Sequence, residues 1–256
     1  MSGQVGITMK RNLLYFICPF KHQDEWRQNV AELFQYLDAF NHRRIVTISQ
    51  GKGIENAGEV QKMFEGKRIE FIEVENDPIL CETRPFVRML NEVQSVHAQE
   101  ISFYAHAKGV SYERGSSYLR NIQLWRRAMY YFCLNDMRQI DSVMQHFNCC
   151  GCFKRSRSCK PYVPEPWHFS GTFFWFNHQK LYSHPNWAQI KKDTRWAVEG
   201  YLATLFEEKS AYCLFGENKK KNDTRSPKNW NESKWNQILS PYSLSVNSMP
   251  FNKFVG

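Results

Sequence analysis

Short β-like runs alternate with amphipathic helical patterns over the first two thirds of this chain. Residues 13–18, 44–49, 69–74 and 101–104 are short and apolar, and they predict strands. Between them, residues 24–40 and 84–96 place apolar side chains at three- and four-residue spacing, which is typical of helices that pack on a sheet. Strands that alternate with helices favour an α/β fold, with a mostly parallel sheet flanked by helices.

The rest of the chain continues the pattern less regularly. Residues 117–147 predict one long helix or two joined helices, 149–167 a strand followed by a loop, 168–177 a strand, 194–206 a helix and 211–215 a closing strand. Beyond Gly216 the chain is polar, basic and rich in Asn and Ser, which indicates an exposed arm or a disordered tail. We therefore expect a single domain over 1–215 and a basic polar extension over 216–256.

The charge and the cysteines narrow the class of protein. A formal net charge of +9 favours a polyanionic partner, such as a phosphorylated small molecule, a nucleic acid or an anionic membrane. The most apolar stretch near the N-terminus, residues 12–18, is far shorter than the roughly 20 residues of a membrane helix, so we expect no transmembrane segment. Without a secretory leader, the eight cysteines indicate reduced thiols and a cytoplasmic protein.

Polar and charged residues follow all four predicted strands of the N-terminal half. Because ligands of open parallel sheets bind beyond the carboxyl ends of the strands, these loops are candidate binding segments. Lys and Arg there can neutralise phosphate, and Gly lets backbone N–H groups approach it; the alternative is ordinary solvated loops. Neither a Walker loop nor a G-x-G-x-x-G follows the first strand, which argues against a nucleotide-hydrolysing or dinucleotide-dependent enzyme. The loop residues are Lys21, His22, Lys52, Asn76, Asp77, Glu82, His106, Lys108 and Arg114.

Two further segments carry candidate site residues. In "HFSGTFFWFN" the small pair Ser170 and Gly171 interrupts an aromatic strand, and a glycine there often marks the close approach of a backbone or a ligand. His168 precedes the pair, and the alternative is a core strand with a buried histidine. Glu199 lies among apolar residues of the 194–206 helix, where a carboxylate can serve as a general base or be a solvated, salt-bridged helix residue.

The cysteines at 149, 150, 152 and 159 form a cluster of unassigned role. Cys149, Cys152 and Cys159, with His146 and His168 to complete the ligands, raise the alternative of a zinc site. A C-x2-C pair without a second matched pair is a weak signal, and the spacing fits no zinc module.

Taken in order, these pieces resemble a family of small GT-A-type glycosyltransferases found in fungi, bacteria and viruses. The resemblance covers about 13–215 and rests on the opening strand with "CPF", then "NDPILCETRPFVRML", "YAHAKGVS", "WRRAMYYF", the "CG" at 150–151, "HFSGTFFWFN" and "VEGYLATLF". It implies a GT-A-like, Rossmann-type fold with a nucleotide-sugar half over about 1–115 and an acceptor half over about 116–215.

The sequence departs from the GT-A pattern at one place. Where the fourth strand of GT-A enzymes usually ends in a metal-binding Asp-x-Asp motif, this chain has His106-Ala107-Lys108. A lysine does not ligate a metal but can neutralise phosphate, so we expect Lys108 to stabilise the departing nucleoside diphosphate and His106 to hydrogen-bond the donor. A divalent metal, Mn²⁺ or Mg²⁺, held by Asp77 or Glu82 remains the alternative, and no other cofactor is expected.

The resemblance also implies the residues of each subsite. Glu199 is the expected general base, with Asp193 as its rival, and it acts with Lys108 and His106 as the catalytic set. The junction between donor and acceptor is expected at His168, Ser170, Gly171, Trp125 and Arg126. The donor-binding residues are expected to be Pro19, Lys21, Asn76, Asp77, Glu82, His106, Lys108 and Gly109.

The expected function is transfer of a sugar from a UDP- or GDP-linked donor to a hydroxyl acceptor, which the sequence leaves open between a glycan and a nucleic acid. The alternative is a nucleic-acid-binding module, in which the basic, Trp-containing tail and loop 153–160 contact phosphate and stack on bases.

Overall fold

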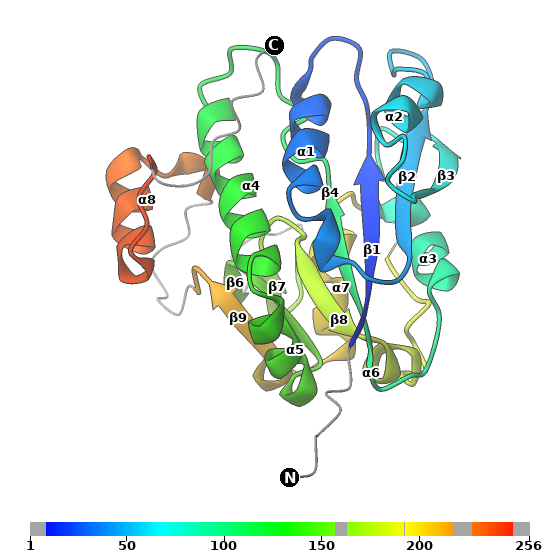
Figure 1. Cartoon of the computed structure of the whole chain (residues 1–256), viewed down its shortest axis with the longest axis vertical. Helices are drawn as coiled ribbons and strands as arrows, with labels where there is room; N and C mark the ends of the chain where they lie inside the picture. The colour runs from blue at the N-terminus through cyan, green and yellow to red at the C-terminus, as the bar shows by residue number, and fades with distance from the viewer. Residues whose placement is uncertain (1–8, 157–162, 192, 218–226, 248–256) are drawn as a thin grey trace.

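A seven-stranded sheet forms the centre of the protein (Figure 1). The computed structural model describes residues 9–156, 163–191, 193–217 and 227–247. The strands lie in the order β3-β2-β1-β4-β8-β5-β9. Their bounds are β1 Lys10–Ile17, β2 Arg44–Gln50, β3 Glu70–Glu75, β4 Glu100–His106, β5 Cys149–Cys152, β8 Phe174–Asn177 and β9 Ala211–Phe215.

The sheet is mostly parallel, as the sequence predicts. β1 pairs in parallel with β2 and β4, and β2 with β3, while β8 runs antiparallel between β4 and β5. The continuous apolar run of β1 fits its place at the centre, because a strand buried on both faces needs apolar side chains on both. The predicted α/β fold class is confirmed by this sheet and by the helices on either side of it.

Helices cover both faces of the sheet. Leu13, Tyr15 and Ile17 of β1 point into a core with helices α1 Glu25–Phe34, α2 Ala57–Met63, α4 Leu119–Leu134 and α5 Met137–His146. Leu14 and Phe16 point the other way, into a core with α3 Thr83–Glu92, α6 His178–Tyr182 and α7 Ala197–Leu205. The period-two alternation of a strand thus builds two cores from one apolar run. Within the described ranges, no helix has an apolar run long enough to cross a bilayer.

Two predicted helices have different bounds in the structure, and the 117–147 segment takes one of its two predicted forms. The pattern at 24–40 divides into α1 and a 3₁₀ turn, η1 Leu37–Ala39, and the pattern at 84–96 ends at Glu92. The 117–147 segment forms two helices, because the side chain of Asp136 caps α5 by accepting hydrogen bonds from the N–H groups of Arg138 and Gln139 at 3.0 and 3.1 Å.

The single strand predicted over 168–177 is wrong. β7 Trp167–Phe169 pairs with β6 Lys154–Ser156 in a separate two-stranded sheet, and only β8 joins the main sheet. Between β7 and β8 the chain turns through Gly171, with φ +98°, and Thr172, with φ +64°. Left-handed backbone at two successive residues cannot continue a strand, so the glycine marks a tight turn.

The side chains of Cys149 and Cys152 point in opposite directions, which excludes the zinc site that would use both. Cys149 points into the core that holds α7, whereas Cys150 and Cys152 point into the core that holds α4. Since Cys149 and Cys152 lie on opposite faces of the sheet, they cannot ligate one ion. Cys159 lies outside the described residues.

The described part of the C-terminal extension is packed, contrary to the predicted exposed or disordered tail. It forms η3 Pro227–Asn229, α8 Glu232–Leu239 and η4 Ser240–Tyr242, and α8 lies beside α4 (Figure 1). Trp230, Trp235, Leu239 and Val246 are buried in the core of α4. A few large apolar side chains in a polar stretch are enough to anchor it, although they leave the average composition polar.

A buried polar network lies near the amino end of β4. The imidazole of His178 is inaccessible to solvent, with Nδ1 2.8 Å from Ser95 Oγ and Nε2 2.7 Å from Ser102 Oγ. Glu100 accepts hydrogen bonds from Asn12 Nδ2 at 2.9 Å and from Ser95 Oγ at 2.9 Å. A neutral His178 that carries its proton on Nδ1 satisfies all of these contacts.

The pKa values of His178 and Glu100 predict that acid lowers the stability of the fold. Burial lowers the pKa of His178 to about 4, more than nearby Glu100 raises it. Burial acts to raise the pKa of Glu100, but hydrogen bonds from Asn12 and Ser95 outweigh it and hold that pKa below its usual range. Both groups therefore bind protons more readily in the unfolded chain, and acid favours unfolding.

We expect the free energy of unfolding to fall as the pH drops from about 6.5 to about 4 through His178, and further below about 4.5 through Glu100. Urea denaturation of the wild type and of His178→Gln at several pH values measures this. The variant is expected to show a shallower slope between pH 6.5 and 4, whatever its stability at neutral pH. Equal slopes would contradict the assignment to His178.

Candidate active site

A cavity of about 390 Å³ opens where the strand order of the sheet reverses. β2 lies on one side of β1 and β4 on the other, so the loops after β1 and β4 diverge and leave space beyond the carboxyl ends of the strands. Loops after β1, β3 and β4, helices α4 and α7, the β7–β8 turn and the C-terminal extension all contribute to its lining. The polar and charged lining residues are Asn76, Glu82, His106, Lys108, Ser111, Thr172, Arg195, Glu199 and Lys228.

Lys108 lies on one wall, above the face of Trp125. Its ammonium nitrogen is 3.9 Å from the centroid of the Trp125 ring. Its backbone is held by Asn29, whose Oδ1 accepts from Lys108 N at 2.7 Å and whose Nδ2 donates to Lys108 O at 3.0 Å. Gly109 then turns with φ +91°, and an added Cβ there would lie 3.0 Å from Ile122 Cγ2. This clamp sets the direction of the Lys108 side chain.

Arg126 does not line the cavity, contrary to its predicted place at the junction. Its guanidinium is fully buried, donates to the two oxygens of Glu32 at 2.6 and 2.8 Å, and also pairs with Glu25. Burial disfavours its charge, but Glu32 and Glu25 outweigh this and raise the pKa of Arg126. Neighbouring helix residues point about 100° apart, so Trp125 faces the cavity while Arg126 faces α1. Arg126 Nη1 also donates to Lys108 O at 3.3 Å, which links it to the wall indirectly.

His106 and Glu82 meet at the floor of the cavity. His106 Nδ1 contacts Glu82 Oε2, and Thr172 Oγ1 donates to Glu82 Oε1 at 3.4 Å. His106 is the last residue of β4, and Glu82 immediately precedes α3. The structure therefore brings together two residues that the sequence predicts at the donor site, as an ion pair when His106 is protonated.

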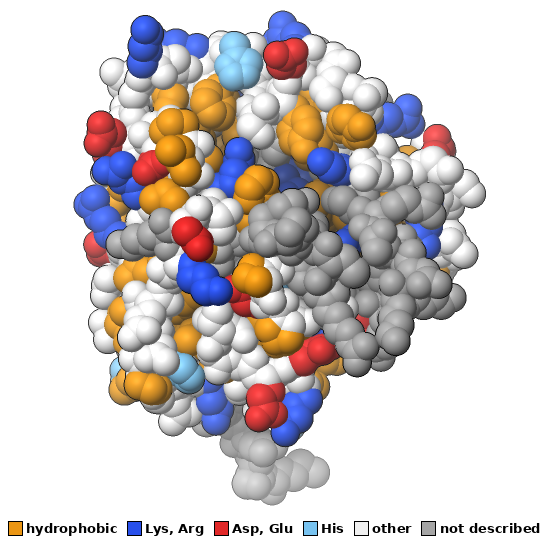
Figure 2. All heavy atoms as spheres, turned by 180° about the vertical axis from the view of Figure 1, so that it is seen from behind, with side chains coloured by type: hydrophobic (Ala, Val, Ile, Leu, Met, Phe, Trp, Pro, Cys, Tyr) orange, Lys and Arg blue, Asp and Glu red, His pale blue; other side chains and the backbone are white. Residues whose placement is uncertain are grey.

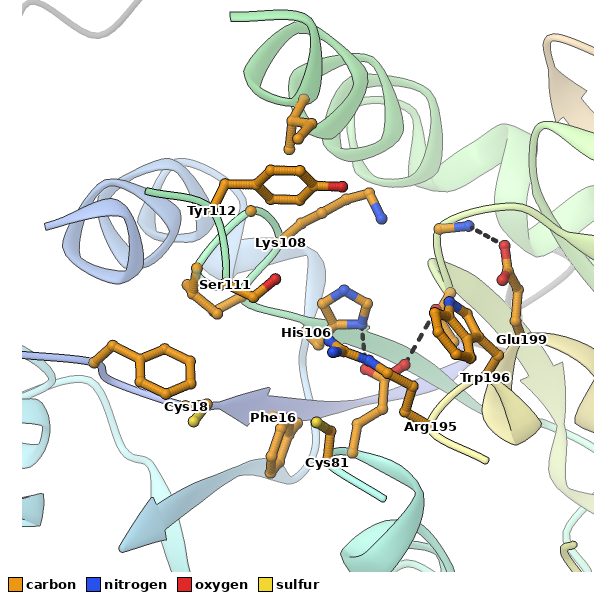
Figure 3. Close-up of a pocket in the computed structure, with 18 of the residues that line it drawn as sticks. Phe16, Cys18, Cys81, His106, Lys108, Ser111, Tyr112, Arg195, Trp196 and Glu199 are labelled. Carbon is orange, nitrogen blue, oxygen red and sulfur yellow. Dashed lines mark hydrogen bonds and ion pairs between the residues drawn. The ribbon is translucent and has the colours of Figure 1, made fainter. Parts of the chain in front are cut away.

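Glu199 also lines the cavity, from the first turn of α7 (Figure 3). The side chain is 6% exposed, and its Oε1 accepts from Gly171 N at 3.1 Å. Gly171 is required here, because an added Cβ would lie 2.9 Å from Trp125 Cζ2 in a backbone with φ +98°. The β7–β8 turn thus connects the carboxylate to the aromatic ring under Lys108.

His168 and Ser170 lie behind the lining instead of on it. Both are 1% exposed, and His168 Nε2 is 3.2 Å from Ser170 Oγ and 3.9 Å from Glu199 Oε1. Of the predicted junction residues, Trp125 and Gly171 line the cavity, while His168, Ser170 and Arg126 surround it from inside the fold.

Seven other predicted residues are not in the cavity lining: Pro19, Lys21, His22, Lys52, Asp77, Arg114 and Asp193. Backbone hydrogen bonds tie Pro19 O to Glu55 N and Lys21 N to Gly53 O, in a contact between the loops after β1 and β2. Asp77 Oδ1 accepts from the N–H groups of Ile79 and Leu80, and these bonds hold the pKa of Asp77 below its usual range. Asp193, the rival base, is exposed outside the lining. Donor binding at Pro19, Lys21 and Asp77 is therefore not supported by their position.

Several lining residues were not predicted from the sequence. Arg195 and Trp196 precede α7, and Trp196 is 40% exposed. The signal in the sequence was a Trp three residues before the candidate carboxylate Glu199. Cys18 and Cys81 also line the cavity. Burial raises the pKa of Cys18 to about 12, so its thiol is protonated at neutral pH and is a poor nucleophile.

The described donors do not fit a divalent-metal site. Glu82 is engaged by His106 and Thr172, and Asp77 is turned into its own loop. Among the residues that the structure describes, no group of three or more His, Cys, Asp and Glu side chains comes close enough to hold an ion. The contacts of Asp77 and Glu82 therefore do not support binding of Mn²⁺ or Mg²⁺ by these two residues.

Comparison with known proteins gives similarity of fold only. No protein-family model matches the chain, and no curated protein matches it. Among solved structures, galactosyltransferase LgtC in complex with donor and acceptor sugar analogs is 13% identical, with a TM-score of 0.42, over 78% of this chain and 72% of that one. A 4-diphosphocytidyl-2C-methyl-D-erythritol synthase is 12% identical, with a TM-score of 0.39, over 86% and 94%. The corresponding synthase of Anaerococcus prevotii is 8% identical, with a TM-score of 0.37, over 78% of each chain. At these values the similarity assigns no activity.

The buried Arg126 predicts a large effect on stability. Arg126→Met leaves Glu25 and Glu32 buried without their main counter-charge, so we expect a loss of about 3–5 kcal/mol in the free energy of unfolding. Urea denaturation measures it. Arg120→Met on the same helix is the control, because the side chain of Arg120 is 72% exposed and we expect its replacement to change stability by less than about 1 kcal/mol. A similar loss in both variants would contradict the role of the buried cluster.

Proposed function

We propose that this protein is a glycosyltransferase that moves a sugar from a nucleoside-diphosphate donor to a hydroxyl acceptor. The observation that supports it is that a lysine and a buried carboxylate, Lys108 and Glu199, line one cavity at the strand-order reversal. The transfer needs a positive charge at the leaving group and a base at the nucleophile, which Lys108 and Glu199 can supply.

The reaction forms a bond between the acceptor oxygen and the anomeric carbon of the sugar. The bond from that carbon to the phosphate oxygen breaks, and the nucleoside diphosphate leaves with the electron pair. In an inverting transfer Glu199 takes the proton of the acceptor hydroxyl. The hydrogen bond from Gly171 N to Oε1 holds the carboxylate in place at the cavity.

Lys108 acts on the charge that develops at the leaving phosphate. Its backbone is clamped by Asn29, so the ammonium group is positioned before the ligand arrives and reorganises little during the reaction. His106 lies near it and, when its ring is protonated, donates to the donor through Nε2, because Nδ1 faces Glu82. In this proposal the protein supplies the positive charge for the diphosphate.

The tryptophans of the extension are not available for the alternative function, nucleic-acid binding. Trp230 and Trp235 of the extension are 7% and 0% exposed, so neither ring face is open to stack on a base. Loop 153–160 is described only to residue 156, and Lys154 there is buried and pairs with Glu217 at 3.2 Å. On the face drawn in Figure 2, Lys and Arg side chains are mixed with acidic and hydrophobic ones. No second function is proposed.

Nucleoside diphosphates are expected to bind and stabilise the protein. A thermal-shift series with UDP, GDP, CDP and ADP, each with EDTA or with Mn²⁺, tests the donor class and the metal question together. We expect a saturable rise in melting temperature with UDP or GDP that persists in EDTA. Stabilisation by none of the four nucleotides would refute the proposed function, and stabilisation that EDTA abolishes would refute the metal-independent form.

Two substitutions test the roles of Lys108 and Glu199 separately. Lys108→Ala is expected to weaken binding of the nucleoside diphosphate and to reduce turnover by about 10²-fold or more. Glu199→Gln keeps an oxygen for Gly171 N and is expected to retain diphosphate binding while turnover falls by about 10²–10⁴-fold. Calorimetric binding and donor turnover measure both, and circular dichroism checks the fold. Normal turnover in either variant would refute the role of that residue.

A further inference from the structure

A cation from the C-terminal extension lines the same cavity. Lys228 lies in η3, more than 100 residues beyond the loop after β4, yet it is part of the wall. Its ammonium nitrogen is 3.5 Å from Tyr112 Oη, which accepts a hydrogen bond from it. Tyr112 itself lines the cavity four residues after Lys108. The extension therefore contributes to the candidate site as well as to the core.

Contacts to both the backbone and the side chain hold Lys228 in its position. Asn121 Nδ2 of α4 donates to Lys228 O at 3.1 Å, and Trp230, two residues on, is buried in the core of α4. Its ammonium nitrogen is 5.7 Å from the ring centroid of Tyr118 and 6.0 Å from that of Tyr112. A lysine whose backbone is anchored in this way stays at the cavity at little further cost in entropy when a ligand binds.

The surroundings of Lys228 favour an anionic ligand. Its described contacts are two aromatic rings and a phenol oxygen, and within the described residues no carboxylate forms an ion pair with it. In Figure 3 the side chains of Lys108 and Tyr112 extend in the same direction from the loop after β4. Since Lys228 lies against Tyr112, the cavity presents the charge of Lys228 on the wall that carries Lys108. Placing a second cation on one wall is unfavourable until an anion enters between them.

We propose that Lys228 is a second phosphate-binding residue, which with Lys108 holds the diphosphate of the nucleotide. This rests on the proposed function for the identity of the ligand. It makes the extension a part of the binding site: the domain up to Phe215 supplies Lys108, and the packed segment after Pro227 supplies Lys228.

Calorimetric titration of the full chain tests the contact with phosphate. UDP and GDP are compared with uridine and guanosine, and inorganic pyrophosphate is titrated as a ligand without a base. Lys228→Gln is expected to weaken binding of the diphosphates and of pyrophosphate about tenfold and to leave nucleoside binding unchanged. Lys228→Arg is expected to stay within about threefold of the wild type, because it keeps the charge.

Lys234→Gln is the matched control. Lys234 belongs to the same segment and lies over the ring of Trp230 at 5.7 Å, outside the cavity lining. The Lys234→Gln variant is expected to bind every ligand with the affinity of the wild type. Melting temperatures without ligand show that each variant is folded.

The outcomes separate this inference from the proposed function. If the wild type binds neither UDP nor GDP, the proposed function fails, while weaker pyrophosphate binding in Lys228→Gln still supports the phosphate contact. Equal diphosphate and pyrophosphate affinities in Lys228→Gln and wild type overturn the inference. Equal weakening of nucleosides and diphosphates also overturns it, since a purely structural role gives that result.

Discussion

The buried cluster of Arg126 with Glu25 and Glu32 is the interaction on which the candidate site depends. It joins α4 to α1, and through Arg126 Nη1 and Asn29 it reaches the carbonyl oxygen of Lys108. A buried ion cluster contributes less to net stability than its contacts suggest, because desolvation offsets much of the attraction. Its effect here is geometric, since a charged fork with fixed partners tolerates only one arrangement of the two helices and the loop.

Different kinds of contact hold three charged residues of the site, Lys108, Glu199 and Lys228. The wall with Lys108 is held by side-chain hydrogen bonds to a loop backbone, whereas Glu199 is held by a helix and a glycine turn that packs against Trp125. Lys228 arrives on a segment anchored by tryptophans in the core of α4. The positions of charge and base thus follow from the packing of α4, which contacts all three parts.

The predictions from sequence succeeded where local pattern decides structure. The four N-terminal strands, the two helices predicted between them, the α7 helix and the closing strand all occur close to their predicted positions, because apolar periodicity is set by neighbouring residues. Lys108, His106, Glu82 and Asn76, which line the cavity, were predicted from one rule about the ends of parallel strands. The rule failed for Pro19, Lys21 and Asp77, because loops can bond to each other or to themselves.

The sequence by itself determined the α/β alternation and the loops from which a site could be built. Only the tertiary structure decided that Arg126 is buried, that Ser170 and His168 lie behind the wall, and that the polar extension is packed with Lys228 at the cavity. The contact of Lys228 with Tyr112 joins residues 116 positions apart. Such contacts depend on which helix faces which neighbour, and the periodicity of a single segment does not encode the identity of its partner.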